Sequence, residues 1–171
     1  MSTLYQFRFE FDAEEDRVLL RVSTTDHTEY LVWFTRRYVR QLWRLLEQAV
    51  DAHPDVARQQ SSVAKRSVAA FHRESALSRT DFSREYETSS VERPVGDQPM
   101  LATRARLSVN SQGMRVLHFA PARGKEVSIS LTDGLLHSFC HILAEIVAKA
   151  EWDLSIVSEE PAVEVMPARL H

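Results

Sequence analysis

The chain has 171 residues, 44% of them hydrophobic, which is enough apolar material for one domain with a sizeable core. Its four glycines are few for this length and disfavour nucleotide-binding folds that depend on glycine-rich phosphate loops. The net charge of -3 disfavours a globally basic nucleic-acid-binding protein, and the single cysteine, Cys140, excludes a disulfide framework and a multi-cysteine zinc site.

The N-terminal stretch alternates polar and apolar residues and lacks the continuous apolar run of a secretory signal. No segment approaches the roughly 18 consecutive apolar residues that a membrane-spanning helix needs. We therefore expect a soluble, cytoplasmic protein with no membrane partner.

The first predicted element is a strand over residues 4–11, where Tyr5, Phe7, Phe9 and Phe11 alternate with polar residues and share one face. A polar turn and an antiparallel strand over 17–23 follow, then a third strand over 29–34. Such an aromatic row could stack nucleic-acid bases. Because the predicted helices need a sheet face to cover, we expect the row to be core.

Thr35 is suited to cap a helix that runs to residue 50. Its apolar positions recur at three- and four-residue spacing, which is typical of an amphipathic helix packed on a sheet: Val39, Leu42, Trp43, Leu46, Ala49 and Val50. A second helix is predicted between residues 51 and 79, with Pro54 in its first turn. Residues 80–100 show no periodicity, so we expect a long, mobile connection.

The second half of the sequence repeats this order of elements. Strands are predicted over residues 102–109, 114–120 and 126–131, and Thr132 is placed to cap a final helix. The polar tail over residues 154–171 contains two prolines and is expected to be flexible, although Ile156 and Val157 could add a short strand.

An internal repeat relates the two halves. A shift of 97 residues places Thr35 on Thr132 and the first helix on the last, and a shift of 98 places residues 17–19 on 115–117 and Phe9 on Leu107. Two amphipathic strand-to-helix segments can also align in this way by coincidence. The predicted fold class is α+β, with two βββα units (residues 4–50 and 101–150) in one domain over 1–153, joined by a mainly helical linker over 51–100.

In this layout the chain resembles the duplicated sheet-plus-helix domains of the PUR and Whirly type, which have four strands per copy where three are predicted here. That resemblance implies binding of single-stranded nucleic acid.

Four arginines stand out at the start of the first helix: Arg36, Arg37, Arg40 and Arg44. Three of them recur at four-residue spacing and form a stripe, and no acidic residue lies between Thr35 and Arg44. Cations at a helix N-terminus oppose the helix dipole, so an anionic partner or nearby carboxylates should compensate them. The stripe is thus either an anion-binding surface or a solvated face paired with acids of the linker.

His137 and His141 are spaced to grip one metal ion, with Cys140 between them. No further ligand is apparent, so we expect ordinary histidines and a buried thiol. The sequence predicts no catalytic, cofactor-binding or metal-binding residue. It favours a non-enzymatic protein-interaction, scaffold or accessory subunit that self-associates or binds a protein partner, and as an alternative a single-stranded nucleic-acid-binding module that uses Arg36, Arg37, Arg40 and Arg44.

Overall fold

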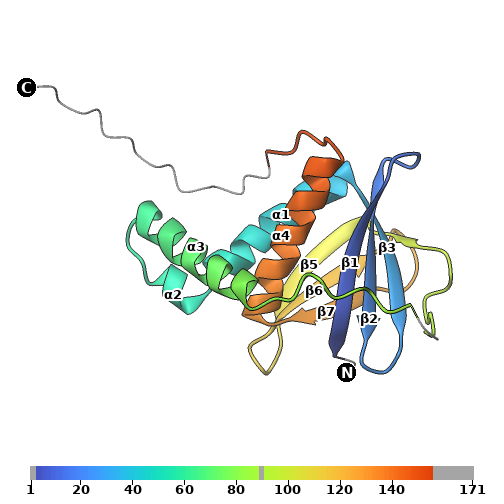
Figure 1. Ribbon diagram of the computed structural model, residues 1–171, viewed down its shortest axis with the longest axis horizontal. Helices are drawn as coiled ribbons and strands as arrows, with labels where there is room; N and C mark the ends of the chain where they lie inside the picture. Colours follow the sequence, from blue (N-terminus) through green and yellow to red (C-terminus); the bar gives the residue numbers. More distant parts are fainter. Residues whose placement is uncertain (1–2, 89–90, 156–171) are drawn as a thin grey trace, which may run out of the picture.

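The computed structural model describes residues 3–88 and 91–155, which form a mixed α+β fold (Figure 1). The predicted α+β class is confirmed. Two sheets and four helices make up this part of the chain, the helices being α1 (Arg36–Asp51), α2 (Pro54–Ala57), α3 (Ser62–Ser78) and α4 (Asp133–Lys149). None of these helices combines the length and apolarity needed to cross a membrane.

The first sheet contains the three strands that the N-terminal patterns predict, together with one that they do not. Its order is β1-β2-β3-β4, with strands at Leu4–Asp12, Arg17–Thr24, Glu29–Thr35 and Met100–Leu101. The first three strands are antiparallel, whereas β4 joins β3 in parallel. A strand of two residues is too short to show a period-two pattern, so no sequence pattern indicates β4.

The second sheet is an antiparallel meander of three strands. Its order is β5-β6-β7, at Arg104–Val109, Arg115–Ala120 and Val127–Leu131. Alternate residues of each strand point toward the helices, as the period-two patterns predict. The row across the middle of the sheet on this face is Leu107, Leu117 and Ile129.

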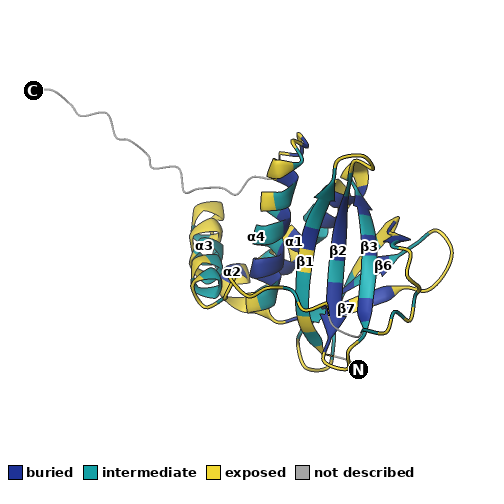
Figure 2. Cartoon of the chain, turned by 45° about the vertical axis from the view of Figure 1, so that its right-hand side comes forward, coloured by how far each residue is buried: buried dark blue, intermediate teal, exposed yellow. Residues whose placement is uncertain are grey.

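α1 and α4 each contact both sheets. α1 follows β3 in the chain and lies against β5, whereas α4 follows β7 and lies against β1. Phe139 of α4 packs on Phe9 of β1 with 5.0 Å between ring centroids, and Phe34 of β3 packs on Phe119 of β6 at 5.4 Å. Buried side chains from both sheets and both helices form one hydrophobic core (Figure 2).

The aromatic row of β1 belongs to this core. Phe9 is buried, Phe7 and Phe11 pack against the core cluster, and Tyr5 at the end of the strand remains 43% exposed. The predicted role of the row in the core is therefore confirmed, and these rings are not a surface for stacking bases.

Both predicted helix caps are present. The Thr35 hydroxyl accepts a hydrogen bond from the Tyr38 amide at 3.1 Å, and the Thr132 hydroxyl accepts one from the Leu135 amide at 3.3 Å. Each satisfies an amide that the first helical turn leaves without a backbone partner. Trp43 is half buried rather than fully buried, and its indole N–H donates to Glu47 at 3.0 Å.

The predicted helix between residues 51 and 79 is divided in two. α2 ends at Ala57, and Ser61 then caps α3 by accepting a hydrogen bond from the Ala64 amide at 3.1 Å. α3 packs on α4 on the side away from the sheets (Figure 1). No described residue of α3 is buried, which explains its irregular apolar stripe.

The connection from α3 to β4 runs along the first sheet and is anchored at Glu29. This carboxylate is almost wholly buried and accepts hydrogen bonds from Tyr86 at 3.0 Å and from Arg93 at 2.8 Å, while Arg21 pairs with it at 3.3 Å. Glu92 adds a parallel bridge to the same edge of β3. The connection thus supplies two of the three partners of a buried charge.

The end of the described chain packs on the first hairpin. The Trp152 indole N–H donates to Asp16 at 2.7 Å, and its ring meets Phe11 edge-on at 6.0 Å. Ile156, Val157 and the rest of the predicted tail from residue 156 onward lie outside the described residues.

The strand register corrects one part of the predicted repeat. The core row of the first sheet is Phe9, Leu20 and Val32, and its counterpart in the second sheet is Leu107, Leu117 and Ile129. Leu20 therefore corresponds to Leu117, a shift of 117 − 20 = 97, and the predicted match of residues 17–19 with 115–117 is wrong by one residue. Since neighbouring residues of a strand face opposite sides, that match would place Leu19 in the core, whereas it lies outside the core cluster.

Candidate functional site

The four predicted arginines lie on the solvent side of α1. The helix turns its other side inward and buries Tyr38, Val39, Leu42, Leu46 and Ala49. Arg36, Arg37, Arg40 and Arg44 are exposed, and we refer to these four residues as the arginine face of α1.

Within the described part of the chain, no residue of the arginine face forms an ion pair or a hydrogen bond through its guanidinium group. Other arginines behave differently, since Arg21 and Arg93 both pair with Glu29. Among the described residues, the acidic residues of the linker therefore do not pair with the stripe, contrary to one of the two alternatives. Across residues 3–88 and 91–155, the four charges have no carboxylate partner.

The charge order along α1 opposes the helix dipole. The first turn contains no acidic residue and the last turn contains no basic one, while Glu47 and Asp51 lie toward the C-terminal end. A cation in the first turn of an exposed helix costs about 0.3–1 kcal/mol relative to a favourable placement. Arg36 and Arg37, in the first turn, thus do not stabilise their own helix through its dipole.

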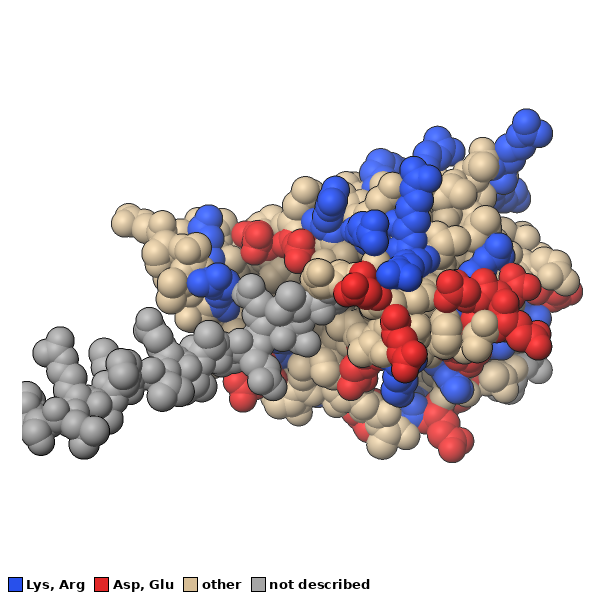
Figure 3. Space-filling model, turned by 90° about the horizontal axis from the view of Figure 1, so that it is seen from above, with Lys and Arg blue, Asp and Glu red and all other residues tan. Residues whose placement is uncertain are grey.

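Further basic residues lie beside this helix. The Tyr38 hydroxyl reaches the Arg104 carbonyl at 3.5 Å, and the Arg104 side chain is exposed on the neighbouring strand β5. From above, lysine and arginine side chains gather along one edge of the molecule, separate from most acidic side chains (Figure 3).

His137, His141 and Cys140 are not brought together as metal ligands in the described residues. His137 is buried, and burial lowers its pKa, with a further contribution from nearby His72. His141 pairs with Glu145 at 3.6 Å on the surface of α4. Burial raises the pKa of the Cys140 thiol to about 12, as suits a side chain packed against the core.

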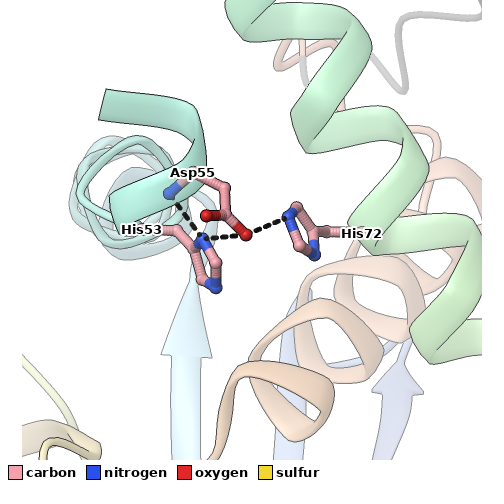
Figure 4. Close-up of side chains that lie close together, drawn as sticks. All are labelled: His53, Asp55 and His72. Atoms are coloured by element: carbon pink, nitrogen blue, oxygen red, sulfur yellow. Dashed lines mark hydrogen bonds and ion pairs between the residues drawn. The ribbon is translucent and has the colours of Figure 1, made fainter. Parts of the chain in front are cut away.

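A different cluster, which no sequence pattern predicts, joins His53, Asp55 and His72 (Figure 4). Their potential ligand atoms all lie within 4.8 Å of one another. The first two residues flank Pro54 at the start of α2, and His72 comes from α3. A His-Pro-Asp sequence followed by a distant histidine was the available signal, but only the packing of α3 on α2 brings these side chains together.

A second polar network crosses the outer face of the second sheet around His118. Its Nε2 lies 2.8 Å from the Ser108 hydroxyl, and its Nδ1 lies 2.9 Å from Glu126 and 2.8 Å from Ser128. A serine, a histidine and a carboxylate in this order resemble a nucleophile with its base. Here His118 Nδ1 is shared among Glu126, Ser128 and Arg106. The network joins side chains of β5, β6 and β7 and the turn before β7, which favours a structural role.

Comparison with protein-family models, with curated proteins and with solved structures finds no match to this chain.

Proposed function

We propose that this is a non-enzymatic interaction protein that binds single-stranded nucleic acid through the arginine face of α1. One observation carries the proposal: four exposed arginines on one helix have no partner among the described residues. Their order also opposes the helix dipole, so an external anion would relieve an unfavourable arrangement.

The spacing of the arginines suits a polyanion. Arg36, Arg40 and Arg44 are four residues apart, and at 1.5 Å per residue they rise along the helix in steps of about 6 Å. This is close to the separation of successive phosphates in an extended strand. Arginine pairs with phosphate through two parallel hydrogen bonds, which strengthens each contact. The net charge of -3 means that attraction would be confined to this surface.

The test is the binding of a fluorescent single-stranded oligonucleotide, followed by anisotropy over a series of salt concentrations. Wild-type protein should bind with an affinity that falls as salt increases. In the Arg36→Glu, Arg40→Glu double variant, the slope of log affinity against log salt should decrease by roughly 0.7 for each phosphate that the protein no longer neutralises.

The matched control is the Arg123→Glu, Lys125→Glu double variant in the exposed turn before β7, which changes the net charge by the same amount. It should bind like wild type if attraction is local to α1. Equal weakening by both double variants, or no binding by wild type at low salt, would reject the proposal.

A second candidate function is self-association as a scaffold, and the surface of α3 favours it. This helix buries no residue, and its Phe71 and Val63 are 69% and 62% exposed. As this second candidate, we propose that a second copy of the chain covers these two side chains. Sedimentation should show a concentration-dependent dimer that Phe71→Ser disrupts. A wild-type chain that stays monomeric at high concentration would remove this candidate.

We also propose that the two βββα units are copies of one ancestral unit. The corrected core rows, the two threonine caps and the reciprocal packing of α1 on β5 and α4 on β1 support this relationship. At the positions equivalent to Arg36, Arg40 and Arg44, the second helix has Asp133, His137 and His141, and His137 is buried. The proposed binding surface therefore belongs to the first copy alone.

A further inference from the structure

We propose that His53, Asp55 and His72 form a binding site for a divalent transition-metal ion of the zinc class, with Asp133 as the outer partner of His53. Two imidazoles and one carboxylate are the ligands that zinc takes in proteins with an open coordination position. This site is separate from the arginine face and does not depend on the function proposed above.

The donor atoms already lie close to the separations that such an ion requires. Asp55 Oδ2 is 3.3 Å from His72 Nε2 and 3.9 Å from His53 Nδ1. Tetrahedral zinc with bonds of about 2.0–2.1 Å places neighbouring donors roughly 3.4 Å apart. The His72–Asp55 separation matches this value, and the His53 donor, which lies within 4.8 Å of both other donors, would move closer to them when an ion binds.

The local sequence holds two of the ligands in place. His53 is the N-cap of α2, with an extended backbone, and Pro54 follows at the first helical position. His53 Nδ1 accepts a hydrogen bond from the Asp55 amide at 3.2 Å, so this nitrogen presents a lone pair toward Asp55. A bound ion would replace that hydrogen bond at the same nitrogen.

Asp133 completes the arrangement from α4. Its Oδ2 lies 3.5 Å from His53 Nε2, which can donate its proton to this carboxylate. A metal-bound histidine commonly donates its other ring N–H to a carboxylate, which fixes the ring and increases its basicity. Asp55 Oδ1 is 3.9 Å from Arg58, so its second oxygen, Oδ2, faces the two histidines.

The site is open to solvent on one side. The His53 and His72 side chains are 20% and 28% exposed, and that of Asp55 is 50% exposed. His53, Asp55 and Asp133 also line a surface depression whose other walls include Leu107, Val109 and Arg115. The partial exposure of all three side chains gives an ion access to them, and three protein ligands leave one tetrahedral position for water.

The experiment is a titration of chelator-treated full-length protein with zinc chloride at about pH 7.5, followed by calorimetry. Wild type should bind one ion per chain. His72→Ala and Asp55→Asn should each weaken binding by more than about 100-fold, and Asp133→Asn by about 10–100-fold, the range typical of outer partners.

His141→Ala is the matched control, because His141 is a surface histidine that also lies beside a carboxylate, Glu145. It should leave zinc affinity unchanged. Magnesium chloride should give no binding, because nitrogen donors select transition metals over magnesium. Circular dichroism of each variant with chelator present identifies any variant that fails to fold. Asparagine is chosen at position 55 because Asp55→Asn preserves the side-chain volume.

The proposal would be overturned if folded His72→Ala or Asp55→Asn bound zinc as tightly as wild type does. The absence of stoichiometric zinc binding by wild type would also overturn it, and the three side chains would then be an N-cap with surface ion pairs.

Discussion

Phe139 of α4 packs on Phe9 of β1, so a residue of the second unit completes the core of the first sheet. Phe139 also meets Phe7, with 5.4 Å between ring centroids. Its side chain is fully buried, and it joins the helix of one unit to the aromatic row of the other.

Replacing Phe139 by alanine should lower the free energy of unfolding by about 3–5 kcal/mol, because the missing ring leaves a cavity between the helix and the first sheet. Urea unfolding measures this change. Phe82→Ala is the matched control, since Phe82 is 49% exposed, and it should cost less than about 1 kcal/mol. Equal losses of stability in the two variants would contradict the shared core.

Glu29→Gln should lower the free energy of unfolding by about 1.5–3 kcal/mol, the range for hydrogen bonds to charged groups, because Glu29 is buried and has three donors. Glu10→Gln, on strand β1, removes a half-exposed partner of Arg21 and should cost less than about 1 kcal/mol. Chemical denaturation, followed by tyrosine and tryptophan fluorescence, measures the free energy of unfolding of both variants. A larger loss of stability for Glu10→Gln would show that Glu29 does not anchor the connection.

The free energy of unfolding should fall as the pH drops below about 6.5, the usual pKa of histidine, in part because of His137. Burial lowers the pKa of His137 in the folded protein, so the unfolded chain binds the proton more tightly. Acid therefore favours unfolding until the pH passes below the folded pKa, where the effect levels off. His137→Gln cannot titrate, and its urea midpoint, measured with a chelator present, should change less than that of wild type. If the urea midpoints of wild type and His137→Gln changed equally with pH, His137 would not be a cause of the loss of stability in acid.

Cys140 should react slowly with thiol reagents in the folded protein. Burial raises its pKa to about 12, so at about pH 8 its thiolate fraction is roughly a thousandfold below that of a free thiol with a pKa near 8.5. Alkylation in urea, where the same thiol is exposed, provides the reference rate. Similar rates with and without urea would show that the thiol is accessible.

The regular elements could be predicted because their residues follow simple periods. Phe7 and Phe9 alternate with polar residues along β1, and Thr35 and Thr132 mark helix starts through a local hydrogen bond. These signals depend only on neighbours in the chain.

Features that depend on distant packing were not predictable in this way. The exposure of the arginine face follows from the helical period, but the lack of a partner for Arg40 among the described residues depends on where the linker acids lie. His72 comes close to His53 only through the packing of α3. The error of one residue in aligning β2 with β6 has the same origin, since the pairing of Leu117 with Leu107 shows which side chains face the core.

The reciprocal packing of helices and sheets has a consequence for synthesis on the ribosome. Phe7 and Phe9 are synthesised long before the ring that covers them, because Phe139 belongs to the last described helix. The first sheet must therefore wait with an apolar face uncovered until nearly the whole described chain has been made, and contacts so distant in sequence form slowly.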